Sequence, residues 1–543
     1  MMKKLTTLIF FLAFPLISPG QQLWLSTSTG TPDNNVNTKV AIDNAGKFYT
    51  ITTWLNASSM LYIQGQNANF SQYWSKYISC ASPSGVFGTE IITNGASSLY
   101  IVGHFSAPIY FQGSVSLYPQ GAQDAFIIKM STSGAFTWIR QLSGGTIYAD
   151  NIAIDSLENI YISGTFLGTA DFDGGAGTHY VSCTGDSDLF IEKLDSAGNF
   201  AWVKTMMGVG QWGNWIADMA VANGNIYTTG EIGLVVDLDP GLGVQSFSAL
   251  GFSDMFIQKL DTSGNLVWAK QIGGAGYCYG TAVAVAPNED IFIAGSYSDD
   301  TLDLDPGSGT ANIINYGSYD GFLVKLDSSC NFSWGKTIGG WGLDNCQGLV
   351  LDSVANVYAL GAFEGMANLN DPNLYYVNSA GSSDIYFQKR DSSGAFIWGT
   401  SIGGDDSDMP GNIQISPGGL VFVAGNFMDS IDLAPGNATA LHPSLGGYDA
   451  FIAAYTNPGP TGIPMAKNTF RQADVYPNPS PGAVFISSGD EIEEVTVTDM
   501  LGRQVYADQP KKKNFRLTIE TPGTYVIRVT SGGHTTVKKI IIY

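Results

Sequence analysis

The stretch DLFIEKLDSAGNFAWVKTMMG at residues 188–208 returns as DMFIQKLDTSGNLVWAKQIGG at residues 254–274, and the same unit appears again at Asp320 and Asp384. Each copy has two short segments of alternating apolar and polar residues around a Gly-containing turn, which is the pattern of a β-hairpin. A second hairpin pattern follows, for example NIAIDSLENIYISGTF at residues 151–166. The sequence therefore predicts repeated units of four strands, which must stack because a single unit cannot bury its apolar face.

Tryptophans mark the period of this array. They are Trp24, Trp74, Trp138, Trp202, Trp268, Trp334 and Trp398, and the last five steps are 64, 64, 66, 66 and 64 residues. Four strands per unit without a helical period is the pattern of a β-propeller. The strand at residues 21–29 has no hairpin before it, and the strand at residues 448–456 has no tryptophan strand after it. We therefore expect an all-β fold, a seven-bladed β-propeller in which the N-terminal strand closes the last blade and removes a free sheet edge.

The repeated units resemble the seven-bladed β-propeller repeat family of secreted bacterial proteins, whose copies carry the pattern D-x-F-x-x-K-x-D-x-x-G-x-x-x-W-x-K. The resemblance covers roughly residues 22–456 and concerns the fold, not an activity. The first unit departs from the pattern, since Trp24 and Trp74 are only 50 residues apart and SMLYIQGQ at residues 59–66 lacks the Lys-x-Asp element. In the other units we interpret Lys-x-Asp as a ring of salt bridges or turn caps between blades.

The two ends of the chain differ from the array. Residues 1–20 place two lysines before an apolar stretch, which predicts a secretory signal peptide. We expect the propeller to span residues 21–456 and a Pro- and Gly-rich linker to follow at residues 457–474. Residues 475–543 contain five short alternations, which predict a small C-terminal β-sandwich.

This last segment resembles the C-terminal sorting domain of the type IX secretion system of Bacteroidetes. The residues that carry the resemblance are Tyr476, Pro477, Asn478, Pro479, Asp499, Gly502, Pro522, Gly523, Tyr525, Lys538 and Lys539. The resemblance implies the type IX secretion machinery as a partner. It also implies translocation across the outer membrane of a Gram-negative bacterium and a secreted or cell-surface location.

Composition narrows the classes of ligand. A net charge of −22 disfavours nucleic acid and anionic membrane surfaces, because binding to phosphates needs clustered Lys and Arg. After the signal peptide, no apolar run is long enough to span a membrane. The five cysteines are too few for a disulfide framework. We interpret them as buried free thiols, with a Cys278–Cys346 bridge as the alternative.

One acidic pattern recurs after the second strand of a unit, in a segment that also has the alternation of an extra hairpin. It contains the pairs Asp171 and Asp173, Asp237 and Asp239, and Asp303 and Asp305. Paired carboxylates before a glycine turn suit calcium, the one cofactor that we consider. The alternative is that these aspartates cap backbone amides in a turn.

Candidate binding residues come from departures from the repeat. Trp212, Trp215 and Trp341 lie in Gly-rich connections where other units have small or polar residues, on the face that also carries the extra hairpins. No Ser-His-Asp arrangement or His cluster is present. We interpret His104 as a solvated residue at a strand end, with a place in the lining of the channel as the alternative. We therefore predict an exported, non-catalytic binding or adhesion module for a glycan or protein ligand. The alternative is a secreted carbohydrate-active enzyme, a lyase or hydrolase that uses loop carboxylates.

Overall fold

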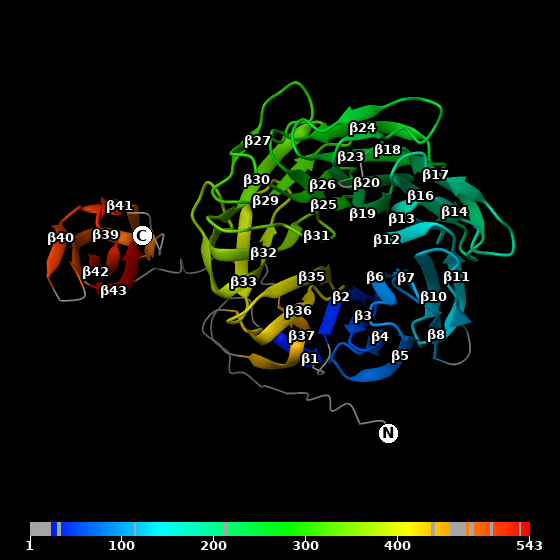
Figure 1. The fold of residues 1–543 in the computed structure, drawn as a ribbon, viewed down its shortest axis with the longest axis horizontal. Helices are drawn as coiled ribbons and strands as arrows, with labels where there is room; N and C mark the ends of the chain where they lie inside the picture. Colours follow the sequence, from blue (N-terminus) through cyan, green and yellow to red (C-terminus); the bar gives the residue numbers. More distant parts are fainter. Residues whose placement is uncertain are drawn as a thin grey trace. The chain divides into compact units, whose positions relative to one another are not determined.

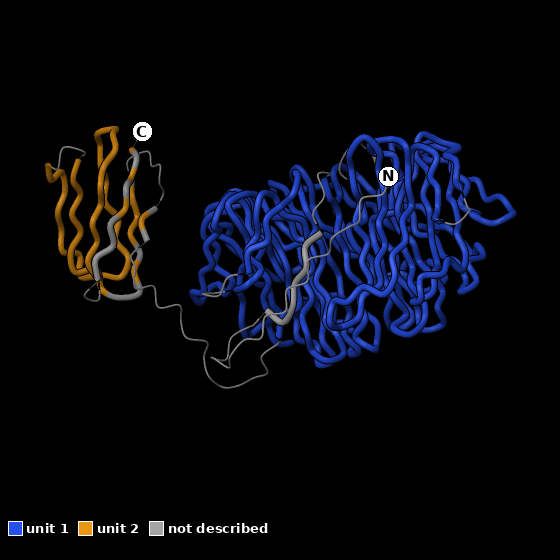
Figure 2. The backbone as a smooth tube through the Cα atoms, turned by 90° about the horizontal axis from the view of Figure 1, so that it is seen from below, with its two compact units in different colours: residues 1–460 blue, residues 461–543 orange. Residues whose placement is uncertain are grey.

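The computed structural model describes residues 23–29, 34–112, 116–209, 214–435, 440–456, 474–476, 483–499, 503–531 and 534–542. The chain divides into two compact units, Met1–Pro460 and Thr461–Tyr543 (Figure 2). The described residues form strands and their connections, and none of them belongs to a helix. Accordingly, no helix in this part of the chain could cross a membrane. The predicted signal peptide and most of the predicted linker lie outside the described residues.

The N-terminal compact unit is built from repeated four-strand units, each an antiparallel meander. The first is β2(Asn34–Ile42), β3(Phe48–Leu55), β4(Ser59–Gln66) and β5(Gln72–Cys80), and the second is β6(Val86–Thr93), β7(Ser98–Phe105), β10(Asp124–Ser131) and β11(Phe136–Leu142). The third is β12(Thr146–Ile154), β13(Ile160–Leu167), β16(Asp188–Leu194) and β17(Phe200–Met206), and the fourth is β19(Trp215–Ala222), β20(Asn225–Ile232), β23(Asp254–Asp261) and β24(Leu266–Ile272). The fifth is β25(Cys278–Val285), β26(Ile291–Tyr297), β29(Asp320–Leu326) and β30(Phe332–Gly340), and the sixth is β31(Gly348–Leu351), β32(Val357–Asn368), β33(Tyr376–Arg390) and β34(Phe396–Ile402).

The last four-strand unit joins the two ends of the array. It consists of β35(Asp408–Ile415), β36(Val421–Asp432), β37(Leu441–Tyr455) and, from the N-terminal end of the chain, β1(Leu23–Thr29). β1 pairs antiparallel with β37, from Leu23 opposite Tyr455 to Thr29 opposite Ala450. The predicted pairing of these two segments is confirmed.

The first strands of the units contact one another in a closed cycle, β2 to β6, β12, β19, β25, β31, β35 and back to β2. Figure 1 shows the units following one another around a ring, from blue through green to yellow, with β1 beside β37. Because consecutive strands of a meander run in opposite directions, the connections alternate between two faces of this ring. Short turns lie on one face. The other, which we call the long-loop face, receives the connections between second and third strands and between successive units.

Short extra strands extend these long connections. The pairs are β8(Ile109–Phe111) with β9(Ser116–Leu117), β14(Thr169–Asp171) with β15(Tyr180–Ser182), β21(Val235–Asp237) with β22(Ser246–Ser248), and β27(Thr301–Asp303) with β28(Asn312–Ile314). β18(Gly208–Val209) pairs with β21. The extra hairpins expected from the acidic segments are therefore present.

The repeated tryptophans connect neighbouring units. A Cβ atom added at Gly198 would lie 2.7 Å from the Trp138 ring of the preceding unit. Gly198 also has a positive φ of 79°, which a turn at this place requires and which side chains disfavour. Trp74 packs on the turn of the second unit in the same way, where its Nε1 donates a hydrogen bond to Thr132 O at 2.9 Å. The Ser-Gly turn and the tryptophan recur together because each forms half of one contact.

The Lys-x-Asp elements have the ordinary role expected from the sequence. Asp195 Oδ1 accepts the N–H groups of Ala197 and Asn199 at 2.9 and 2.8 Å and so caps its own turn. Lys193 Nζ donates to Thr262 O of the next unit at 3.1 Å. Lys–Glu pairs span neighbouring units elsewhere, as in Lys129–Glu158 at 3.1 Å and Lys259–Glu289 at 3.2 Å.

The C-terminal compact unit is a separate set of strands. They are β38(Asp474–Tyr476), β39(Ala483–Asp499), β40(Gln504–Asp508), β41(Lys512–Thr518), β42(Gly523–Ser531) and β43(His534–Ile542). β39 changes partners along its length, because its first half pairs with β38 and β41 and its second half with β40 and β42. Alternate residues of these strands, such as Val495, Val497 and Ile527, enclose an apolar core of their own.

Candidate functional site

The acidic pairs lie at the tips of the extra hairpins on the long-loop face. Asp237 Oδ1 accepts the N–H groups of Asp239 at 3.0 Å and Gln245 at 2.8 Å, and Asp239 Oδ1 accepts the N–H of Gly241 at 2.8 Å. The same bonds recur at Asp171, Asp173, Asp303 and Asp305. These aspartates therefore cap backbone amides.

Calcium binding at these pairs stays a prediction. Among the described residues, no group of three or more His, Cys, Asp or Glu side chains is arranged to hold a metal ion. The capping bonds also recur at Asn368, which takes the place of the first aspartate and accepts N–H groups of Asn370 and Tyr375. The bonds thus do not depend on a negative charge.

Trp215 and Trp341, two of the predicted tryptophans, occupy different places on the long-loop face. Trp215 is the first residue of β19 and is 39% exposed, and its Nε1 donates to Glu231 Oε2 at 2.8 Å. Trp341 lies in the connection between β30 and β31 and is 59% exposed. Trp212 falls outside the described residues.

Trp215 belongs to a cavity where the first strands of the units meet. Its volume is about 330 Å³, and residues of β2, β19, β25 and β35 and of the segment before β31 line it. The lining includes Asn37, Lys39, Trp215, Tyr279, Asn345 and Gln347. We call it the inner cavity. The ring thus brings together residues that are far apart in the sequence.

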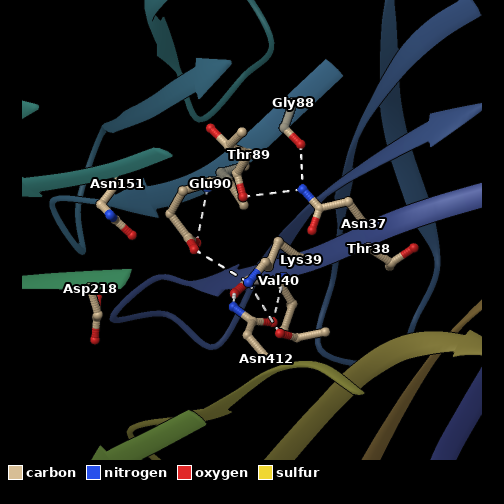
Figure 3. Close-up of polar contacts among 12 residues, drawn as sticks. Asn37, Thr38, Lys39, Val40, Gly88, Thr89, Glu90, Asn151, Asp218 and Asn412 are labelled. Atoms are coloured by element: carbon tan, nitrogen blue, oxygen red, sulfur yellow. Dashed lines mark hydrogen bonds and ion pairs between the residues drawn. The ribbon is translucent and has the colours of Figure 1, made fainter. Parts of the chain in front are cut away.

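The first strands of six units, which surround the inner cavity, share a β-bulge. The pairing of β2, β6, β12, β19, β25 and β35 with the next strand shifts by a β-bulge at corresponding positions. A bulge re-aims the side chains beside it. Here these side chains bond to the next unit, as in Thr89 Oγ1 to Ala149 O at 2.7 Å and Asn151 Nδ2 to Ile216 O at 3.0 Å. Figure 3 shows such contacts between β2, β6 and β35.

The charged side chains beside these bulges, which include Lys39, Glu90, Asp150 and Asp218, are partly buried. Lys39 Nζ lies 3.7 Å from Glu90 and donates to Gly411 O at 3.1 Å. Asp218 Oδ2 accepts the Val283 N–H at 2.8 Å and so links β19 to β25. Although Asp150 and Asp218 keep part of their surface exposed, burial raises the pKa of Asp150 to about 7 and that of Asp218 to about 6.

The expectation of a solvated His104 is wrong. Its ring stacks on Phe87 with centroids 5.4 Å apart and meets Tyr148 edge-on at 5.2 Å. Burial lowers the pKa of this histidine to about 4. His104 is therefore a neutral aromatic packing residue at neutral pH.

Sequence reasoning missed most of the inner cavity. Tyr279 occupies the place in β25 that Trp215 has in β19, and both precede the bulge of their strand. A sequence signal for the cavity was available at the position just before the bulge in the first strand of each unit. This position holds an aromatic residue in several units and Asn345 in the sixth. Comparing that position from unit to unit would have found Tyr279.

All five cysteines are free thiols, and Cys278 and Cys346 are buried. Burial raises the pKa of the Cys346 thiol to about 12. Both thiols pack among apolar side chains, in agreement with the buried-thiol interpretation, whereas Cys183 is only partly buried.

The predicted sorting residues stabilise turns in the C-terminal unit where they are described. Asp499 Oδ2 accepts Arg503 Nε at 2.7 Å across the turn after β39, and Tyr525 Oη donates to Thr521 O at 2.8 Å before β42. Pro522 and Gly523 lie in that second turn and at the start of β42, and Lys538 and Lys539 lie in β43. Tyr476 ends β38, whereas Pro477, Asn478, Pro479 and Gly502 fall outside the described residues.

Comparison with known families identifies this unit. Residues 474–543 match the family described as a secretion system C-terminal sorting domain. The chain carries a type IX sorting domain. Residues 137–165, which lie in the second and third four-strand units, match a β-propeller repeat family. This protein, which has β-propeller repeats and a type IX sorting domain, is therefore secreted or displayed at the surface of a Bacteroidetes cell.

Individual relatives are distant. An uncharacterized WD repeat-containing protein of Acanthamoeba polyphaga mimivirus is 21% identical over 392 residues, which cover 61% of this chain and 28% of that protein. A Bacteroides caccae protein of unknown function has a TM-score of 0.30 at 10% identity, covering 68% of this chain and 93% of that one. PorZ, a surface component of the type IX secretion system of Porphyromonas gingivalis, has a TM-score of 0.20 at 12% identity. The match covers 93% of this chain and 75% of that one.

Proposed function

We propose that this chain is an exported, non-catalytic binding protein. In this proposal residues 1–20 are a signal peptide, residues 21–456 form a seven-bladed β-propeller, and residues 457–474 are a linker. Residues 475–543 form a β-sandwich that the type IX secretion machinery recognises. The four-strand meanders and the cycle of contacts between their first strands support the propeller.

The observation that carries the binding function is the inner cavity. Ligand sites are concave, have aromatic walls and contain a few placed polar groups. A cavity of about 330 Å³ with Trp215 and Tyr279 on its wall and amides from Asn37, Asn345 and Gln347 has these properties. Its size fits a small ligand or the end of a longer glycan or protein ligand. Trp341, on the same face, would contact the parts of a larger ligand outside the cavity.

The positions of the acidic residues favour binding over catalysis. A glycosidase needs two carboxylates that face each other across a substrate. The first aspartates of the loop pairs already accept two N–H groups each, and Glu90 is paired with Lys39. The specific support for the alternative, a secreted lyase or hydrolase, is Asp150, whose raised pKa of about 7 suits a general acid.

One experiment distinguishes these two functions. The chain from residue 21 to 543 is screened against arrays of glycans and of extracellular proteins, and each glycan that binds is then incubated with the protein and analysed for shorter or unsaturated products. We expect retention without product formation. Product formation that Asp150→Asn abolishes would replace the binding protein with an enzyme, and the absence of any array ligand would contradict the proposal.

A further inference from the structure

We propose that the ligand is a neutral oligosaccharide whose end enters the inner cavity and whose following sugars lie on a track of aromatic rings across the fourth and fifth units. This inference rests on the proposed binding function and names its ligand class. The track consists of Phe252, Tyr277, Tyr319 and Tyr279, and it continues to Trp215 through the wall of the cavity.

Ring geometry makes these residues one continuous surface. Phe252 and Tyr277 stack with centroids 4.9 Å apart and an interplanar angle of 12°. Tyr277 lies 6.2 Å from Tyr319, and Tyr319 lies 6.5 Å from Tyr279, which lines the cavity. These separations are within the range of interacting aromatic pairs. The outer end is open to solvent, since Phe252 is 66% and Tyr277 40% exposed.

The backbone beneath the track is fixed by hydrogen bonds between the fourth and fifth units and within the fifth. The Phe252 N–H donates to Gly276 O at 3.0 Å, and the Cys278 N–H donates to Ser253 O at 2.9 Å. The Tyr277 N–H donates to Ser298 Oγ at 2.9 Å. The backbone that carries the rings is therefore held in place before a ligand arrives, which reduces the entropy lost on binding.

Two residues of the track, Phe252 and Tyr277, depart from the repeat. Phe252 stands where the third and fifth units have Asp186 and Ser318, in the same motif before the third strand. Tyr277 of the fifth unit has the same position as Thr146 of the third. Each forms an isolated parallel β-bridge to the preceding unit, Tyr277 with Ser253 and Thr146 with Gln123. The repeating core does not require aromatic side chains at either place, so their presence needs another reason.

The charges near the track oppose an anionic ligand, and the uncharged polar groups of the cavity favour a neutral one. Of the residues that line the inner cavity, Lys39 alone is charged, and it is paired with Glu90 and bonded to Gly411 O. Glu231 accepts the indole N–H of Trp215. The other polar groups of the cavity are amides and hydroxyls, which donate and accept as sugar hydroxyls do. Carboxylates such as Glu231 oppose an anionic glycan, and a cationic peptide is the competing occupant.

Binding of neutral oligosaccharides of glucose, xylose, mannose and galactose, from monomers to hexamers, tests the track. The chain from residue 21 to 543 is titrated at low and high salt. We expect affinity to rise with length and to be insensitive to salt. Phe252→Ala and Tyr277→Ala should weaken binding of the longer oligomers at least about tenfold. They should leave monomer affinity and the melting temperature unchanged, and Tyr110→Ala, which removes a comparably exposed tyrosine from β8, is the control.

Three results would overturn the inference. Equal affinity of the Phe252→Ala and Tyr277→Ala variants for the longest oligomer, with Trp215→Ala impaired, would remove the track and retain the cavity as the binding site. Failure of all neutral oligosaccharides to bind, or tight salt-sensitive binding of a lysine-rich peptide, would remove the ligand class. If Trp215→Ala also binds every ligand normally, the proposed function at this cavity fails as well.

Discussion

At the scale of single residues, the contact between a tryptophan and a glycine connects neighbouring units. Gly198 combines two demands, because its φ of 79° disfavours a side chain and the Trp138 ring lies where a Cβ would be. Gly224 has a similar φ of 74°, but an added Cβ would meet nothing within 4 Å. The pair therefore separates backbone strain from packing.

We predict that Gly198→Ala costs more stability than Gly224→Ala. Strain alone should cost about 1 kcal/mol at Gly224, whereas strain and overpacking together should cost about 2 kcal/mol or more at Gly198. Urea denaturation followed by tryptophan fluorescence measures both losses. Equal losses would contradict the packing role of the glycine.

The raised pKa of Asp150 leads us to predict that the stability of the fold depends on pH. Its folded-state pKa of about 7 lies above the ordinary value, so the folded state binds this proton more tightly than the unfolded state. The resulting stability is complete at acidic pH and is lost as the pH rises through about 7. Asp150→Asn should raise the melting temperature near pH 8 and leave it unchanged near pH 4, with the exposed Asp186→Asn as control. If Asp150→Asn raised the melting temperature equally at both pH values, the raised pKa of Asp150 would not be the cause.

At the scale of elements, the extra hairpins owe their shape to capping bonds. Asp237→Asn should leave the melting temperature unchanged, because asparagine keeps the acceptor as Asn368 does. Asp237→Ala should lower stability by about 1 kcal/mol through loss of the cap.

The effect of calcium on the melting temperature distinguishes the two interpretations of the paired aspartates, capping of backbone amides and binding of calcium. The capping account predicts equal melting temperatures with calcium and with a chelator. A rise with calcium that Asp237→Asn removes would instead establish an ion site, since binding to the folded state raises stability by mass action.

The elements were largely predictable from the sequence, and the site was largely not. Alternation, Ser-Gly turns and the tryptophan period identified the strands and the closing pair of β1 and β37, because these are local patterns repeated many times. A bulge adds one residue to a strand and shifts the phase of its period-two pattern, so the alternation does not tell where the polar side chains beside the bulge point, and they were missed. His104 was misplaced because its neighbours Phe87 and Tyr148 belong to two different units, and the inner cavity likewise combines β2 with β35.

At the scale of the whole molecule, the sorting domain and the proposed binding site belong to different compact units. Deleting residues 475–543 removes the strands of the C-terminal unit and leaves the contacts of residues 23–456 intact. We predict that the truncated chain folds and accumulates in the periplasm. Fractionation and proteolysis of cells carrying the truncated gene measure this, and unchanged surface or medium levels would contradict it.

The central claim is that the inner cavity is the binding site. Calorimetric titration of a ligand identified by the array, with the wild-type chain, Trp215→Ala and the control Tyr180→Ala, tests it most directly. Trp215 lines the cavity, whereas Tyr180 is an exposed residue of β15 in another unit. The account predicts that Trp215→Ala weakens binding at least about tenfold and that Tyr180→Ala binds as the wild type does. Wild-type affinity of a correctly folded Trp215→Ala variant would contradict it.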